Sequence, residues 1–187
     1  CGRQCGKSAS MSIKAAKRAA ENPNRKILII AYTEKQAYEL FFKSLLYLEA
    51  VYPKMIKRGN DKPTMHEINL TNGSCIMCYA TGERGDGLRG FTITDLFMDE
   101  CRKMSDYVWA SVSPMLSVTG GTCDMASTPC GKEGFFYDCS LRDDFKHFYV
   151  SAEDCPRHSK QFLENEKKNM SIMEYSQEYL AIFLDDL

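Results

Sequence analysis

A continuous apolar run at residues 26–33, KILIIAYT, sets the strongest limit on the fold, because it has the length of one β-strand. Amphipathic patterns that are typical of helices lie on both sides of it, at residues 8–21 and 34–52. A strand that is apolar on both faces is usually a parallel strand covered by helices on both sides. The sequence therefore predicts an α/β fold with a mainly parallel central sheet flanked by helices.

Further elements follow in the same alternating order. Residues 65–70 and 74–80 are predicted to form two strands, and the Asn72-Gly73 pair between them favours a tight hairpin turn. The remaining predicted elements are strands at 94–99, 122–129 and 147–151, and helices at 105–116, 135–141 and 157–170. Pro114 is expected to end the first of these helices early.

Size and composition narrow the classes of function. The 187 residues suit one well-packed domain, and 44% hydrophobic with 26% charged residues is typical of soluble globular proteins. No apolar run approaches the roughly 20 residues that cross a bilayer, and we expect no membrane partner. The net charge is −1, and any contact with nucleic acid must therefore come from a local basic surface.

The nine cysteines are an odd number without the short, regular spacings of a disulfide framework, and we interpret them as reduced thiols. Cys75 and Cys78 have the spacing of zinc ligands, but residues three apart on a strand face opposite sides. Cys155 and His158 have a similar spacing, and no second CxxC pair completes either set. We interpret Cys75, Cys78 and Cys123 as small core residues, and His158 as structural or solvated.

The first ten residues, CGRQCGKSAS, end like a phosphate-binding loop but do not begin like one. Gly6, Lys7 and Ser8 match the end of the pattern G-x-x-x-x-G-K-[ST], while Cys1 stands where the first glycine belongs. The helix predicted directly after the loop strengthens the match, because N–H groups at a glycine turn and a helix N-terminus suit phosphate oxygens. The pattern predicts that Lys7 reaches the β- and γ-phosphates of a nucleotide and that Ser8 binds Mg²⁺.

Two carboxylates follow the apolar strand at residues 94–99. Open α/β sheets bind ligands at the carboxyl ends of their strands, where Asp99 and Glu100 are expected. We expect Asp99 to hold the Mg²⁺ shell and Glu100 to orient or deprotonate an attacking water.

Hydrolysis of a γ-phosphate also needs positive charge in the transition state, which an arginine usually supplies. Arg3 lies in the phosphate loop, and Arg84 and Arg89 lie on the glycine-rich loop just before the carboxylate strand. All three are candidates for this catalytic role.

In combination, these motifs resemble those of the large terminase subunit, the ATP-driven motor that packages double-stranded DNA into the capsids of tailed viruses. Terminases often carry a phosphate loop of the form R-Q-x-G-K-[ST] without the first glycine, and residues 3–8 match it. Residues 85–91 and the Asp99-Glu100 pair resemble the family's R-G segment and catalytic carboxylates. Residues 127–138 resemble its coupling motif, and residues 177–183 resemble the stretch that ends its motor domain.

The resemblance implies a P-loop NTPase of the additional-strand, catalytic-glutamate type, with ATP and Mg²⁺ as cofactors. It assigns nucleotide binding to the loop that consists of Arg3, Gln4, Cys5, Gly6, Lys7 and Ser8. It assigns Mg²⁺ to Ser8 and Asp99, and the role of catalytic base to Glu100. Arg89 is the preferred arginine finger, Arg84 is a second candidate on the same loop, and Arg3 is the rival that acts within its own site. Coupling falls to Ser127, Thr128 and Pro129, with Thr128 sensing the γ-phosphate.

The resemblance also implies the surroundings of the motor. We expect residues 1–187 to form one terminase-like ATPase domain, with a strand and an adenine-binding segment before Cys1 and a metal-dependent nuclease domain after Leu187. No nuclease activity is expected from residues 1–187 themselves. The expected partners are double-stranded DNA, further copies of the chain in a ring, the portal and the small terminase subunit, in the host cytoplasm during virus assembly.

Two other functions share these motifs. A helicase-like ATPase carries the same loop and the same Asp-Glu pair, but it needs a second recombination-type domain for which this chain has no room. An inactive nucleotide-binding module that only assembles with partners is the other alternative, although Lys7 and Glu100 show no sign of such decay.

Overall fold

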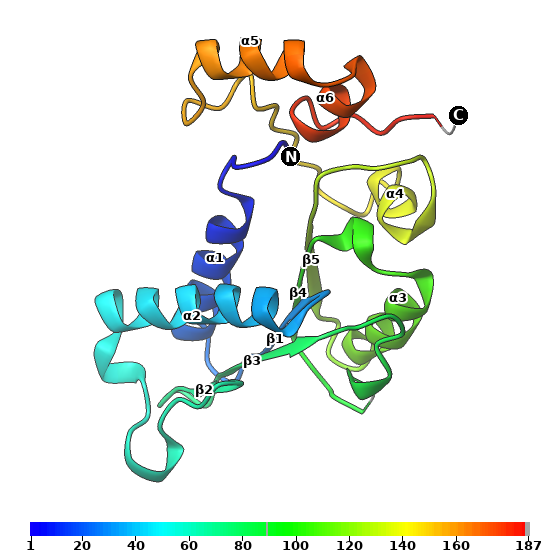
Figure 1. Cartoon of the computed structure of the whole chain (residues 1–187). Helices are drawn as coiled ribbons and strands as arrows, with labels where there is room; N and C mark the ends of the chain where they lie inside the picture. Colours follow the sequence, from blue (N-terminus) through cyan, green and yellow to red (C-terminus); the bar gives the residue numbers. More distant parts are fainter. Residues whose placement is uncertain (89, 186–187) are drawn as a thin grey trace. The chain divides into compact units, whose positions relative to one another are not determined.

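The structure is a computed structural model, and it describes residues 1–88 and 90–185 (Figure 1). The chain forms two compact units. The larger unit is Ser8–Met125, and the smaller unit combines Cys1–Lys7 with Ala126–Leu187.

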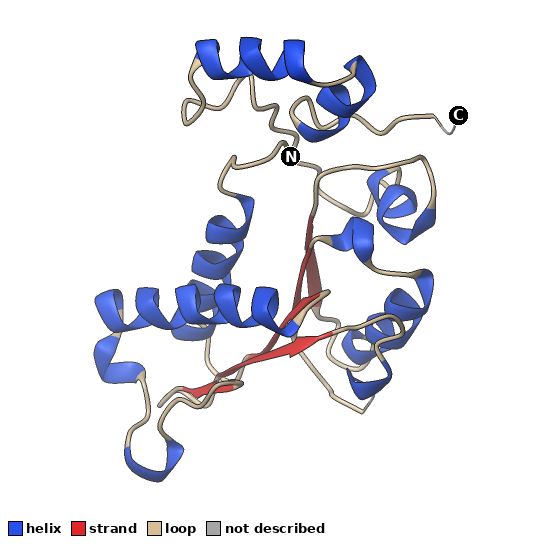
Figure 2. Ribbon diagram, viewed as in Figure 1, coloured by secondary structure: helices blue, strands red, loops and turns tan. Residues whose placement is uncertain are grey.

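A five-stranded sheet forms the centre of the larger unit, in the order β2-β3-β1-β4-β5 (Figure 2). The strands are β1 (Lys26–Ala31), β2 (Glu67–Asn69), β3 (Cys75–Ala80), β4 (Asp95–Asp99) and β5 (Thr122–Ala126). Strand β1 pairs in parallel with both β3 and β4, while β2 pairs antiparallel with β3. The predicted α/β class with a mainly parallel sheet is confirmed.

Helices cover both faces of this sheet. Figure 1 shows α1 (Lys7–Glu21) and α2 (Glu34–Val51) on one side, and α3 (Asp106–Val112) on the other. Residues Ile27 to Ala31 of β1 are therefore buried, as their continuous apolar sequence predicts. Every residue of β4 is buried as well, including the aspartates at its two ends.

Local signals in the sequence fix where these elements begin and end. Thr33 caps α2 in a reciprocal capping box with Gln36, and the helix ends at Val51, two residues before Pro53. The predicted hairpin joins β2 to β3, and its Gly73 has φ +83°, a conformation that favours glycine. Helix α3 gives way to a 3₁₀ helix, η5 (Ser113–Leu116), near Pro114.

Four further short 3₁₀ helices lie in three connections of the described chain, two of them between α2 and β2. They are η1 (Pro53–Met55), η2 (Gly59–Asp61), η3 (Asp86–Leu88) and η4 (Cys101–Lys103). Among the described residues of the glycine-rich segment, 82–88 and 90–91, η3 is thus the one 3₁₀ turn.

The described part of the smaller unit, which ends at residue 185, has the α-helices α4 (Gly134–Ser140), α5 (Lys160–Asn169) and α6 (Ile172–Glu178). Its apolar core joins α5 and α6 to the segment before them, and it consists of Ala152, Leu163, Tyr175 and Tyr179. Ser159 caps α5 by accepting a hydrogen bond from the N–H of Phe162, which explains why this helix begins at Lys160 rather than at the predicted residue 157.

The strand predicted at residues 147–151 is wrong. This segment has no regular secondary structure, and Phe148 and Tyr149 are exposed. Its backbone makes an isolated hydrogen bond, from the N–H of Gly2 to the carbonyl of Val150, instead of the ladder that a strand needs. No helix within residues 1–88 and 90–185 has the length and apolar character to cross a bilayer.

Candidate functional site

The phosphate loop leads directly into α1, which starts at Lys7. Gln4 and Gly6 both have positive φ, 58° and 87°, on either side of Cys5. Left-handed residues within a turn point successive backbone N–H groups toward the same side and create a concave anion-binding surface. The loop thus has backbone geometry suited to phosphate even though Cys1 replaces the first glycine of the pattern.

Lys7 contacts the predicted coupling motif within the smaller unit. Its Nζ donates a hydrogen bond to Oγ1 of Thr128 over 3.3 Å. Ser127, Thr128 and Pro129 follow β5 directly and are all buried. The hydroxyl that the sequence predicts to sense the γ-phosphate therefore lies at the lysine predicted to bind it.

Ser8 and Asp99 meet within the larger unit, although 91 positions separate them in the sequence. The hydroxyl of Ser8 donates to Oδ2 of Asp99 over 2.6 Å, and the backbone N–H of Glu100 donates to Oδ1 over 2.9 Å. Asp99 is the last residue of β4 and is buried. The predicted magnesium ligands are thus adjacent, and they offer a hydroxyl oxygen and a carboxylate oxygen, which are ligands that suit Mg²⁺.

Glu100 follows Asp99 in a left-handed conformation, with φ 56° and ψ 41°. Glutamate rarely adopts this conformation, which ends the extended backbone of the strand. Oε2 of Glu100 lies 4.0 Å from Nε of Arg102. Backbone strain of this kind is concentrated at functional sites, which supports the interpretation of Glu100 as a catalytic residue.

A buried ion pair holds α1 along β4. Asp95 is fully buried, and its carboxylate accepts hydrogen bonds from Arg18, Thr94 and Thr122. Ser8 and Arg18 are separated by about 15 Å along a helix, and Asp95 and Asp99 by about 13 Å along a strand. The two acids of β4 thus bind the two ends of α1, which places Ser8 at the carboxyl end of the sheet.

The candidate arginines differ in their surroundings. Nε of Arg3 lies 2.6 Å from Oε2 of Glu178, an ion pair within the smaller unit that engages its guanidinium. Arg84 lies in the glycine-rich loop and is exposed. Arg89 lies outside the described residues. Sequence reasoning missed Arg157, whose Nη1 would lie 3.2 Å from a Cβ added at Gly6, because 151 positions separate the two residues.

The nine cysteines are all free thiols in the structure. Cys78 is buried, and its burial raises the pKa of the thiol to about 12, in keeping with an inert core residue. Cys5, by contrast, lies beside Cys155 and His158 within the smaller unit. The spacing of Cys155 and His158 gave a signal for this cluster, but nothing in the sequence pointed to Cys5 as a third member.

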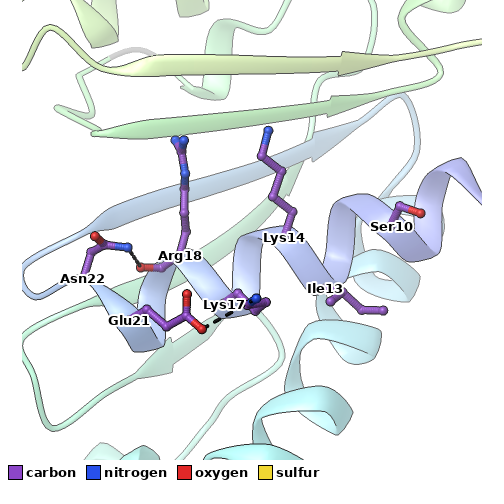
Figure 3. Close-up of a pocket in the computed structure, with 7 residues that line it drawn as sticks. All are labelled: Ser10, Ile13, Lys14, Lys17, Arg18, Glu21 and Asn22. Carbon is purple, nitrogen blue, oxygen red and sulfur yellow. Dashed lines mark hydrogen bonds and ion pairs between the residues drawn. The ribbon is translucent and has the colours of Figure 1, made fainter. Parts of the chain in front are cut away.

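A surface hollow lies along α1 beyond the phosphate loop, lined by Ser10, Ile13, Lys14, Lys17, Arg18, Glu21 and Asn22 (Figure 3). Three cations line it, but each has an acidic partner: Lys14 pairs with Asp124, Arg18 with Asp95, and Lys17 with Glu21. Figure 3 shows the side chains of Lys14 and Arg18 extending from α1 toward the strands. This hollow is therefore a poor candidate for an anion site.

Comparisons with known proteins identify the same family as the sequence motifs do. The family described as "Terminase large subunit, T4likevirus-type, N-terminal" matches residues 1–187. The large terminase subunits of Thermus phage G20c and Thermus virus P23-45 are each 26% identical to the chain over 217 residues. Each match covers 98% of this chain and 44% of the relative, and the chain thus spans less than half the length of these proteins.

Solved structures of the same kind share the fold. The large terminase ATPase domain of Thermus phage P74-26 is similar with a TM-score of 0.80 and 24% identity, over 98% of this chain and 86% of that one. A large terminase from a thermophilic bacteriophage, in complex with ADP, has a TM-score of 0.79 and 14% identity, over 98% and 47% of the two chains. The complex of the same terminase with ATP-gamma-S gives 0.75 and 16%, over 98% and 46%. These likenesses confirm the predicted P-loop NTPase fold.

Proposed function

The chain belongs to the family of N-terminal domains of T4-like large terminase subunits, and from this premise we propose that it hydrolyses ATP to drive double-stranded DNA into a viral capsid. The hydrogen bond between Ser8 and Asp99 carries the proposal. It brings the phosphate-loop helix and the carboxylate strand together at the point where the chemistry requires both.

ATP would bind to the loop formed by residues 3–8. The positive φ angles of Gln4 and Gly6 and the start of α1 at Lys7 support this proposal, because they present N–H groups and a helix N-terminus to phosphate oxygens. The complexes of the thermophilic bacteriophage terminase with ADP and with ATP-gamma-S support it by analogy of fold.

Ser8 and Asp99 would hold Mg²⁺. Their oxygens already lie 2.6 Å apart, and the buried Asp99 gains a further hydrogen bond from the N–H of Glu100 that fixes its orientation. When bound, Mg²⁺ neutralises charge that develops on the phosphate oxygens. Ser8 would exchange its hydrogen bond to Asp99 for the metal contact.

Glu100 would act as the base that orients and deprotonates the attacking water. Its left-handed backbone turns the chain sharply after β4, and this supports a role that differs from that of the neighbouring Asp99. We retain Arg89 as the preferred arginine finger, with Arg84 on the same loop as the second candidate. Arg3 is the weaker choice, because its guanidinium already pairs with Glu178.

Thr128 would report the loss of the γ-phosphate through its contact with Lys7. Ser127 and Pro129 would transmit the change along the segment that follows β5. By family, the partners would be double-stranded DNA, further copies of the chain in a ring, the portal and the small terminase subunit, with the host cytoplasm as the place of action. A helicase-like ATPase and an inactive nucleotide-binding module remain the alternatives.

ATP binding and hydrolysis by matched variants test this function. Lys7→Ala should abolish ATP binding, because it removes the charge that meets the phosphates. Glu100→Gln should bind ATP normally but hydrolyse it at least about 100-fold more slowly, because a general base contributes that much or more. Lys17→Ala serves as the control, since Lys17 lies on the same helix and pairs with Glu21 at the surface.

Equal hydrolysis by the parent and both variants would contradict a catalytic role for the site. Duplex DNA should stimulate the parent more strongly than single-stranded DNA does. The reverse preference would favour the helicase-like alternative, and absent hydrolysis with normal ATP binding would favour the inactive module.

A further inference from the structure

Three side chains with metal-binding atoms converge in the smaller unit. They belong to Cys5, Cys155 and His158, and their sulfur and ring nitrogen atoms all lie within 4.8 Å of one another. Cys155 is buried, while Cys5 and His158 are partly exposed. The cluster thus has one anchored side and one side that solvent can reach.

The chain folds locally to bring Cys155 and His158 together. The backbone N–H of His158 donates to the carbonyl of Cys155 over 3.2 Å, which closes a turn across residues 155–158. Both side chains can therefore face Cys5, unlike Cys75 and Cys78, which lie along the extended strand β3.

His158 is held in a state that suits a metal ligand. Its Nε2 lies 2.9 Å from the carbonyl oxygen of Arg3, and because a carbonyl can only accept, Nε2 must carry the proton. The neutral ring then has its lone pair on Nδ1. A backbone carbonyl bound to the second ring nitrogen is the usual support of a histidine ligand. The ring also stacks on Phe162, with ring centres 6.1 Å apart.

Two thiols and one imidazole form a ligand set that selects zinc among the common divalent ions. Tetrahedral zinc with Zn–S bonds of about 2.3 Å requires its sulfur atoms to lie about 3.8 Å apart. The atoms of this cluster need only small shifts to reach that geometry, and both the exposed Cys5 loop and the His158 ring can supply them.

We propose that Cys5, Cys155 and His158 bind one Zn²⁺ ion, with a solvent molecule as the fourth ligand on the exposed side. The ion would tie the phosphate loop to the turn at 155–158, two segments about 150 positions apart. It would thereby restrict the loop between Arg3 and Gly6. An effect of this restricted loop on ATP affinity rests on the proposed function, whereas binding of the metal itself does not.

Titration of the reduced, purified protein with Co²⁺ tests the site without nucleotide. Co²⁺ replaces zinc in such sites and gives thiolate-to-cobalt charge-transfer absorption only when cysteine sulfur binds it. We expect one thiolate-bound Co²⁺ per chain, displaced by one equivalent of Zn²⁺. Cys5→Ser and His158→Gln should each weaken Co²⁺ binding at least 10-fold, while Cys130→Ser, which changes an exposed cysteine outside the cluster, should leave it unchanged.

Thermal unfolding provides a second readout that does not depend on the spectrum. Zn²⁺ should raise the Tm of the parent and of Cys130→Ser, because a ligand that binds only the folded state stabilises it. The Tm of Cys5→Ser should not respond, and its cooperative melt would show that it is folded.

Three results would overturn the proposal. They are the absence of a thiolate-to-cobalt band in the reduced parent, equal Co²⁺ affinity in the parent and the Cys5→Ser variant, and a Cys5–Cys155 disulfide in metal-free protein that takes up no Co²⁺ after reduction. None of these measurements involves ATP, and failure of the ATPase proposal would therefore leave them unaffected.

Discussion

Glu100 combines an unfavourable backbone conformation with the position at which a hydrolytic base is needed. A non-glycine residue in a sparsely populated backbone region costs about 1–3 kcal/mol. The surroundings of Asp99 overcome that cost, because its carboxylate accepts from both the Ser8 hydroxyl and the Glu100 N–H and so fixes the peptide between the two acids. The carboxylate of Glu100 is thereby directed differently from that of Asp99.

Replacement of Glu100 by asparagine should separate stability from activity. Asparagine tolerates the left-handed region better than glutamate does, and Glu100→Asn should raise the free energy of unfolding by up to about 1 kcal/mol. ATP hydrolysis should fall at least about 100-fold. Urea unfolding and a phosphate-release assay measure the two effects. Glu83→Asn, at an exposed loop position without positive φ, should change neither, and a less stable Glu100→Asn protein would argue against stored strain.

The roles of residues could be predicted from the sequence where their motifs follow one another in the order that is typical of the family. Ser8 and Asp99, and likewise Lys7 and Thr128, could be assigned to one chemical task before their contacts were known. The approach of Arg157 to Gly6 could not, because no local pattern links positions that lie so far apart. The positive φ of Glu100 could not be predicted either, since the sequence around this residue indicates only the end of an ordinary strand.

At the scale of elements, the packing of helix α1 along strand β4 determines whether Ser8 and Asp99 meet at the proposed Mg²⁺ site. The two acids at the ends of β4 bind Ser8 and Arg18 near the ends of α1. Asp95 has no accessible surface, and Arg25 adds a second cation 3.7 Å from its Oδ2. A buried carboxylate with these partners positions the helix along the strand.

Loss of the Asp95 charge should therefore be costly. Breaking a buried ion pair destabilises proteins by about 3–5 kcal/mol, and we expect about 3 kcal/mol for Asp95→Asn, because water can still solvate the Arg18 side chain. That side chain is 31% exposed. Guanidinium unfolding monitored by circular dichroism measures the loss. Asp61→Asn breaks the surface pair with Lys57 and should have no measurable effect, and equal stability of the two variants would contradict a positioning role for Asp95.

Elements were predictable where burial makes the pattern continuous or periodic. The continuous apolar run predicts strand β1, and the periodic apolar face together with the following Pro53 predicts helix α2. Residues 147–151 carry a similar apolar pattern but form no strand, because strand formation needs a hydrogen-bonded neighbour that sequence alone cannot identify. The exposed side chains of Phe148 and Tyr149 in this segment show that apolar residues are not always buried.

At the scale of the whole molecule, the fold class followed from the alternation of helices and buried strands, and the family from the order of its motifs. The chain spans less than half the length of its curated terminase relatives. Ring assembly, DNA translocation and the identity of the arginine finger depend on partners and on Arg89, and they remain predictions. They concern contacts between molecules, which local sequence patterns do not specify.

The location of bound ATP tests the central claim most directly. A crystal structure of Glu100→Gln with ATP and Mg²⁺ should show the phosphates on the backbone N–H groups of residues 3–8, Lys7 at the γ-phosphate, and the metal between Ser8 and Asp99. Nucleotide density in the hollow along α1, or phosphates without contact to Lys7 and Ser8, would contradict the account.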